Sequence, residues 1–156
     1  MAFSTDLQIE LIATGEKAGL WGTITNNNLQ ILELASSGYF STAALATGNL
    51  TLQLDNGSAA GTTTASGKNL MIEVTGTLTA NRVITMPTGA ERIFIVKDST
   101  VRSSSNFTIG VQNVGATTGI VPLTSGASTI YYTDGTTADS MKLLGVLNES
   151  FYNVVG

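Results

Sequence analysis

With 156 residues, of which 42% are hydrophobic, the chain is long enough to form one domain with a substantial core, which excludes a disordered tail. Charged residues make up only 12% and the net charge is −4, so the surface is weakly protected against contact with copies of itself, as in a protein built for an assembly. Cysteine and histidine are both absent, which excludes a zinc site of the usual ligand types and nucleophilic catalysis by either residue.

The N-terminal region, residues 1 to about 40, carries the only helix signal in the sequence. Any of residues 25–28, Thr-Asn-Asn-Asn, can cap a first helical turn, because each offers a side-chain acceptor to unpaired backbone N–H groups. Apolar residues such as Leu29 and Leu32 then recur at helical spacing, and Gly38 suits the C-terminal end. We predict a helix of roughly a dozen residues, which is marginal in water alone and so must dock on something.

Other signals in this region and beyond exclude some partners. The first residues lack a basic segment followed by a long apolar run, so we expect no secretory signal. No stretch of the chain reaches the roughly 18 apolar residues of a membrane span. The basic residues are few and scattered along the chain. We therefore expect neither a membrane nor a nucleic acid as partner.

From about residue 48 the apolar residues recur at every second position, which is the period of a half-buried strand. The segment NLTLQLD, for example, puts Leu50, Leu52 and Leu54 on one face and then meets the turn pair Asn56-Gly57. Clusters of glycine, serine and threonine separate it from the other segments with strand character. These are NLMIEVTG, RVITMP, RIFIVKD, NFTIGVQNV, TIYYTDG and MKLLGVL.

The segment RIFIVKD is apolar on both faces, through the run Ile93, Phe94, Ile95 and Val96. We expect such a strand at the centre of a sheet, with both of its faces covered. Seven or more short strands with turn signals between them predict an all-β fold, a β-sandwich or jelly-roll-like domain with a short N-terminal helical arm. Residues 1–40 are assigned to the arm, for docking or oligomerisation, and residues 41–156 to the β-sandwich body.

No combination of residues predicts catalysis. Asp55, Asp98 and Asp134 each stand where a strand meets a turn, and an aspartate there commonly accepts hydrogen bonds from its own backbone. The stretch GTTTASGKN resembles a phosphate-binding loop, but the spacing of its glycines differs and Asn69 stands where Ser or Thr would bind magnesium. We expect no enzymatic activity, no cofactor and no metal site.

Tyr131 and Tyr132 are candidates for contact with a glycan on a host surface. Adjacent residues of a strand point to opposite faces, so only one of the two rings can lie in the core. The outward ring is the candidate contact for a glycan or a neighbouring subunit.

The stretch LIATGEKAGLWGTITNNNLQILELASSGY has a recognisable pattern. A polar segment with Gly-Glu comes first, followed by Trp-Gly-x-x-Thr-Asn-x-Asn. A short helix that ends near a glycine comes last. The matching residues are Trp21, Gly22, Thr25, Asn26, Asn28 and Leu29. The pattern resembles the N-terminal module of tail-fibre and related virion proteins of tailed bacteriophages, particularly those of marine and cyanobacterial hosts.

A second stretch, VTGTLTANRVITMPTGAERIFIVKDST, followed by FTIGVQN and STIYYTDGT, is similar to the β-module that comes next in the same proteins. The matching residues are Gly76, Leu78, Ala80, Pro87, Ile95, Val96, Asp134 and Gly135. The resemblance covers about residues 7 to 145. Members of the family usually continue into a longer shaft or receptor-binding region, whereas this sequence ends at NESFYNVVG, which favours an adaptor, collar or surface-decoration role.

The resemblance implies a three-fold symmetric assembly in the virion, made in the host cytoplasm. There, a docking or oligomer interface is expected, with the asparagines capping the helix and bonding to a neighbour's backbone. Its residues are Trp21, Gly22, Thr25, Asn26, Asn28, Leu29 and Leu32. Burying an indole removes roughly 200 Å² from water, which is on the order of 5 kcal/mol at most. The alternative is that Trp21 packs on the β-body of its own chain.

The sequence thus predicts a non-enzymatic virion structural protein, a small tail-, fibre- or collar-associated module that forms a homotrimer and docks to other virion proteins. A host-surface adhesin that holds glycan through exposed tyrosines is a second hypothesis, and a capsid decoration protein is a third. By composition alone, a low-charge extracellular domain is a further alternative.

Overall fold

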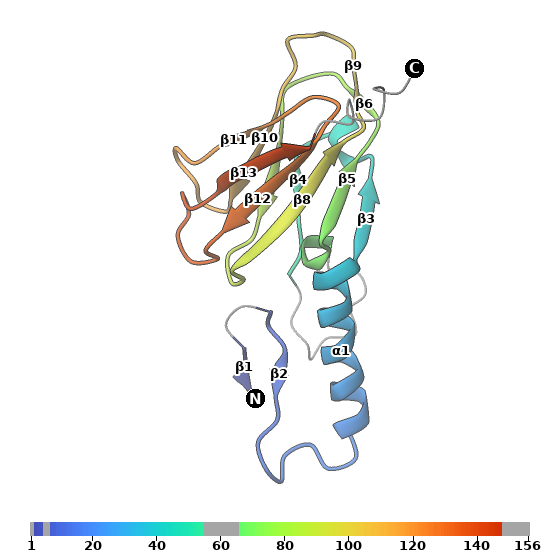
Figure 1. The fold of residues 1–156 in the computed structure, drawn as a ribbon, viewed down its shortest axis with the longest axis vertical. Helices are drawn as coiled ribbons and strands as arrows, with labels where there is room; N and C mark the ends of the chain where they lie inside the picture. Colours follow the sequence, from blue (N-terminus) through green and yellow to red (C-terminus); the bar gives the residue numbers. More distant parts are fainter. Residues whose placement is uncertain (1, 5–6, 55–65, 148–156) are drawn as a thin grey trace, which may run out of the picture.

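A computed structural model describes residues 2–4, 7–54 and 66–147 of the chain. Within these ranges the chain forms strands in several sheets and one long α-helix (Figure 1). The expectation of a mainly-β fold with an N-terminal helix is confirmed. The predicted turn at Asn56-Gly57, the strand end at Asp55 and the first part of the stretch GTTTASGKN lie outside the described residues.

Two larger sheets contain most of the strands. The first has five strands in the order β13-β12-β8-β5-β3. They are β3 (Tyr39–Thr42), β5 (Met71–Val74), β8 (Arg92–Asp98), β12 (Ser128–Thr133) and β13 (Lys142–Leu147). The second has four strands in the order β11-β10-β7-β4. They are β4 (Leu50–Thr51), β7 (Arg82–Met86), β10 (Ile109–Asn113) and β11 (Val121–Leu123).

All seven segments with strand character contribute a strand to these sheets, whereas β3 and β11 are not predicted by the alternation. Smaller elements complete the fold. Two short pairs are β1 (Ala2–Phe3) with β2 (Glu10–Leu11), and β6 (Thr77–Leu78) with β9 (Val101–Arg102). Two short 3₁₀ helices are η1 (Ala44–Ala46) and η2 (Ser66–Lys68).

The chain passes back and forth between the two larger sheets. β3, β5 and β8 belong to one sheet and alternate along the sequence with β4, β7 and β10 of the other. As a result, neighbours within each of these sets of three run parallel, and the antiparallel pairs of the two larger sheets all involve β11, β12 or β13. Parallel neighbours require a crossover connection, and here each crossover passes through the opposite sheet.

Side chains from both sheets form a single buried core. Phe94 of β8 and Tyr131 of β12 stack at its centre, with 5.7 Å between their ring centroids. Aliphatic side chains surround them: Leu45, Leu50, Leu52, Ile72, Val74, Leu78, Ile84, Met86, Val96, Ile109, Val111, Leu123 and Met141. The period of two explains this arrangement, because Ile72 and Val74 of β5 are fully buried while the alternating residues of the strand are not.

β8 lies at the centre of the five-stranded sheet, as the sequence predicts. The expectation that both of its faces are covered is wrong within the described part of the chain. Phe94 and Val96 point into the core and are fully buried, whereas Ile93 is 53% exposed and Ile95 is only partly buried. One face of an apolar strand is therefore open.

Helix α1 (Trp21–Ser37) begins earlier and is longer than the sequence predicts. The preceding residue, Leu20, makes no side-chain cap hydrogen bond, and Thr25 and Asn26–Asn28 lie inside the helix. Their prediction as N-terminal caps is wrong, and Trp21 is the first helical residue rather than a residue before the helix. The predicted end at Gly38 is confirmed.

The C-terminal end of α1 is fixed to the five-stranded sheet. Gly38 alone separates α1 from β3, so the predicted domain boundary between residues 40 and 41 falls inside a strand. The Leu70 N–H donates to the Leu34 carbonyl oxygen at 3.0 Å, and the Met71 N–H donates to the Gly38 carbonyl oxygen at 3.0 Å. In Figure 1, α1 extends downward from the edge of the sheet that β3 and β5 form.

The N-terminal segment with β1 and β2 lies beside α1 (Figure 1). Asn28 ties it to the helix, because its side-chain oxygen accepts the Glu10 N–H and its amide donates to the Glu10 carbonyl oxygen, both at 2.9 Å. The buried Glu10 side chain also pairs with Lys17 at 3.2 Å. Asn28 therefore binds its own chain through both ends of its amide, and the expected bonds from the asparagines to a neighbour's backbone stay a prediction.

Candidate interaction surface on helix α1

One side of α1 is apolar and exposed. Trp21, Thr25, Leu29 and Leu32 follow one another at spacings of four, four and three residues, which places them along one side of a helix. Trp21 is 65% exposed, Leu29 57% and Leu32 43%. We call these four residues the helix stripe. The alternative that Trp21 packs on its own β-body is wrong, since most of its surface is exposed.

A neighbouring side of the same helix is apolar and buried. Ile24 and Ile31 lie one heptad apart and are 5% and 0% exposed. Asn28 lies between them, where its amide binds Glu10. A helix at the surface of a single domain normally needs one apolar side. α1 has two, and within the described part of the chain only the side with Ile24 and Ile31 is covered.

α1 also carries very little charge. Glu33 is the only charged residue among its 17, with no acidic residue in the first turn and no basic residue in the last. An apolar partner lying on the stripe would therefore desolvate few charged groups. Gly22 and Asn26 are exposed on α1, and their role as contacts stays a prediction. Neither α1 nor any other helix in the described ranges is long and apolar enough to cross a membrane.

The two candidate tyrosines of β12 point to opposite faces of the strand. Tyr131 is fully buried, its hydroxyl donates to the Pro122 carbonyl oxygen at 2.8 Å, and burial raises its pKa. It cannot contact a glycan, so its prediction as a surface contact is wrong. Tyr132 points outward, and its hydroxyl donates to the Glu91 carboxylate at 2.6 Å, which raises the pKa of Tyr132. The expectation that only one ring lies in the core is confirmed.

Asp134, directly after β12, holds a turn, as predicted, and Asp139 in the following loop also binds backbone N–H groups. The Asp134 carboxylate accepts the backbone N–H groups of Thr136 at 2.9 Å and Thr137 at 2.8 Å, and these bonds, with Thr137 first, lower its pKa. The Asp139 carboxylate accepts three consecutive N–H groups, those of residues 117–119, and its pKa is lowered mainly by the bond from Thr118. Both carboxylates are committed to backbone, so their role is structural.

Asp98 at the end of β8 is buried and serves the same purpose. Its carboxylate accepts the Thr100 N–H at 3.0 Å and forms an ion pair with Arg102 at 2.6 Å. Across residues 2–4, 7–54 and 66–147, no three acidic side chains gather in a way that would hold a metal ion.

Glu73 of β5 organises a polar cluster on the outer face of the five-stranded sheet. Its carboxylate accepts the Ser99 hydroxyl at 2.6 Å and the Tyr39 hydroxyl, and Lys97 lies 3.5 Å away. The hydrogen bonds from Ser99 and then Tyr39 lower the pKa of Glu73 to about 2. The charge of Glu73 is therefore balanced within the chain.

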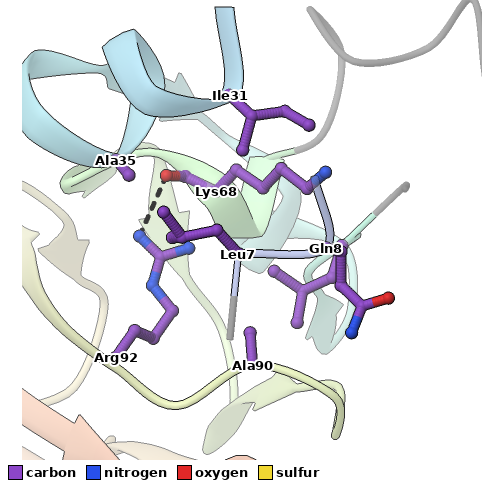
Figure 2. A pocket seen from close by; sticks show the side chains of 8 residues that line it. Leu7, Gln8, Ile31, Ala35, Lys68, Ala90 and Arg92 are labelled. Carbon is purple, nitrogen blue, oxygen red and sulfur yellow. Dashed lines mark hydrogen bonds between the residues drawn. The ribbon is translucent and has the colours of Figure 1, made fainter. Parts of the chain in front are cut away.

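A small cavity lies where the N-terminal segment, α1 and η2 meet the start of β8 (Figure 2). Its volume of about 10 Å³ holds no more than one water-sized sphere. The Arg92 guanidinium crosses this junction and donates to the carbonyl oxygens of Gly67, Lys68 and Asn69. Burial lowers the pKa of Arg92 to about 10. The geometry is that of a structural joint between α1 and the sheet, in which Arg92 of β8 binds the segment with η2, and η2 contacts α1.

A second exposed apolar surface is not anticipated by the sequence analysis. It lies on the outer face of the five-stranded sheet, where Ile93 and Tyr39 are 53% and 57% exposed. The run from Ile93 to Val96 is apolar on both faces and so indicates this surface. The surface was not predicted, because this strand was expected to be covered on both faces.

The functional interpretation rests on these surfaces, because comparison of the chain with protein-family models, with curated proteins and with solved structures gives no match.

Proposed function

We propose that the protein is a non-enzymatic structural protein of a bacteriophage virion, a homotrimeric module that joins other proteins of the tail, fibre or collar. The observation that carries the proposal is the helix stripe, an exposed apolar side on a nearly uncharged helix. The resemblance of the segment around Trp21 to virion proteins supplies the biological context and the three-fold symmetry.

We infer that the body of this module is a β-sandwich. The support is that the two larger sheets share a single core, with Phe94 and Tyr131 of one sheet in the same cluster as Ile84 and Val111 of the other. A jelly roll fits less well, because its strands pair antiparallel, whereas β3, β5 and β8 run parallel here.

The length of α1 and the free energy expected from burying its exposed apolar side are both compatible with association between copies of the chain. A 17-residue helix is about 25 Å long, which allows several turns of side-chain packing between parallel copies. The exposed part of Trp21 alone is on the order of 100 Å² and would contribute on the order of 3 kcal/mol if fully buried. Leu29 and Leu32 add further apolar area along the same side, so a trimer would cover a surface that one chain leaves in water.

A charge placed within the stripe tests the proposal. Leu29→Glu in the full chain should reduce the mass measured by light scattering from that of a trimer to that of a single chain, because a carboxylate would have to be buried between copies. Thr23→Glu is the matched control, since Thr23 is exposed on α1 but lies away from the stripe. Equal masses for Leu29→Glu and Thr23→Glu would contradict a role for the stripe in assembly.

A second candidate function, glycan binding at a host surface, is favoured by one observation. Tyr132 points outward beside Glu91, and Glu91 lines an open hollow together with Gln8, Gly89, Ala90, Asp134, Gly135 and Thr136. An aromatic ring next to carboxylates and loop hydroxyls is a common environment for a sugar. Binding on a glycan array that Tyr132→Ala abolishes would support this function, and failure of the intact protein to bind any glycan or host cell would count against it.

A further inference from the structure

The outer face of the five-stranded sheet carries a continuous apolar row. In the register of the sheet, Tyr39 of β3 is opposite Met71 of β5, Met71 is opposite Ile95 of β8, and Ile95 is opposite Ile130 of β12. All four side chains point away from the core, because their strand neighbours, such as Ile72, Phe94 and Tyr131, are fully buried. We call Tyr39, Met71, Ile95 and Ile130 the sheet row.

The outer face of the four-stranded sheet differs. There one row across three strands consists of Thr51, Thr85 and Gln112, which are the polar residues expected on a sheet face that meets water. The next row consists of Val83, Gly110 and Pro122, and Ile120 beside it is 53% exposed. Within the described residues, only the five-stranded sheet carries an apolar row that crosses four strands.

The carboxylates on the apolar face have partners inside the chain. Glu73 lies between Lys97 and the hydroxyls of Tyr39 and Ser99, and the Tyr132 hydroxyl binds Glu91. The exposed Lys142 lies on β13, which is the edge strand, and so at the rim of the face. A surface whose central charges are already paired can lie against an identical surface without burying an unpaired charge.

We infer that this face packs against other copies of the same chain, so that the sheet row and the helix stripe form one subunit interface. The inference rests on the proposed trimer and specifies where its subunits meet. The two surfaces are held together rigidly, because only Gly38 separates α1 from β3 and the Leu34 and Gly38 carbonyl oxygens accept N–H groups from the start of β5.

The exposed area approaches that of a standard interface. Trp21, Leu29 and Leu32 on the helix and Tyr39 and Ile93 on the sheet are each 43% to 65% exposed. Together they present on the order of 500 Å² of side-chain surface, to which the partly exposed members of the sheet row add, against the roughly 800 Å² that each partner buries in a standard interface. The two surfaces together therefore approach this size.

Ile95→Lys tests the inference in the full chain. Ile95 lies on the central strand of the sheet, so a lysine there would place a charge in the middle of the proposed interface. We expect the mass measured by light scattering to fall from three chains to one. The matched control is Thr85→Lys, which places the same charge on the outer face of the other sheet and should leave the trimer intact. A trimer in both variants would overturn the inference.

Two variants together distinguish a failure of this inference from a failure of the proposed function. If Leu29→Glu dissociates the trimer while Ile95→Lys does not, the proposed function stands and the inference about the sheet fails. If the unaltered chain is monomeric, both fail. Circular dichroism of each variant checks that the strands are retained.

A second measurement uses spin labels, so it does not require a lysine to be placed inside the proposed subunit interface. The chain has no cysteine, so Ile93→Cys and Thr51→Cys each provide a single attachment point for a spin label at an exposed position. Labels at residue 93 should show strong dipolar coupling between copies and reduced mobility compared with labels at residue 51. Equal coupling and mobility at the two positions would overturn the inference.

Discussion

The outer faces of the two sheets differ more than their inner faces do. Inward, both sheets supply aliphatic and aromatic side chains to one core. Outward, one presents a polar row, Thr51, Thr85 and Gln112, beside a shorter apolar row, and the other presents the sheet row across four strands. Folding of the single chain explains the inner faces. We propose that a second copy of the chain covers the sheet row, so that the apolar pattern of this sequence reflects burial in an assembly as well as burial in the fold.

The largest expected effect on stability comes from comparing substitutions at two adjacent residues of β8 that point to opposite faces of the sheet. Phe94→Ala removes a fully buried ring from the core and should lower the free energy of unfolding by about 3–5 kcal/mol. Ile93→Ala, on the opposite face, should change the stability of the separated chain by less than about 1 kcal/mol. Urea unfolding of both variants at low protein concentration measures the difference. Similar losses would mean that the outer face is covered within the chain.

The joint between α1 and the sheet is the next most sensitive feature. Arg92→Met keeps the packing of the side chain but leaves the carbonyl oxygens of Gly67, Lys68 and Asn69 without their donor. We expect a loss of about 2–3 kcal/mol in urea unfolding. Lys142→Met, at an exposed position of β13, is the control and should be nearly neutral. A neutral Arg92→Met would mean that the guanidinium does not hold the joint.

Two glycines at opposite ends of α1 should respond with opposite signs. A Cβ at Gly38 would lie 2.4 Å from the Leu34 carbonyl oxygen and 2.6 Å from the Asn69 side chain, so Gly38→Ala should cost about 1–3 kcal/mol. Gly22 has open space around its Cα, and Gly22→Ala should stabilise the helix by about 0.5–1 kcal/mol. Thermal unfolding compares the two variants. A stabilising Gly38→Ala would contradict the close junction between α1 and β3.

The smallest expected effect is a pH dependence at the polar edge of the apolar face. The pKa of Glu73 is lowered from 4.5 to about 2, so its favourable contribution is complete above about pH 4.5 and is lost as the pH falls toward 2. The difference in Tm between the unaltered chain and Glu73→Gln should therefore be on the order of 1 °C at pH 7 and shrink toward zero near pH 2, because the partly exposed cluster is screened by solvent. A difference that grows on acidification would contradict the hydrogen bonds assigned to Glu73.

The strands were largely predictable from the sequence, but their order was not. Alternation located all seven segments with strand character and the inward faces of several, such as Ile72 and Val74 in β5. Alternation carries no information about which strands are neighbours, and the parallel pairs arise from a chain that alternates between sheets. β11 escaped prediction because it is three residues long with Pro122 in the middle.

The candidate site was predictable in part. The residues Trp21, Leu29 and Leu32 were identified from their type and spacing, and all three are exposed on α1. The helix start was predicted five or more residues too late, because the asparagines resemble caps, whereas Asn28 instead binds the backbone of Glu10 from a distant part of the chain. The sheet row could not be found from sequence, since its members come from four strands whose register only the fold defines.

The most direct test of this account is the solution mass of the full, unaltered chain, measured by light scattering over a range of concentrations. The account predicts a species with three times the 16.1 kDa mass of one chain, dissociating only on dilution. A mass of one chain at every concentration would contradict it, because the helix stripe and the outer face of the five-stranded sheet would then be apolar surfaces that stay exposed to water.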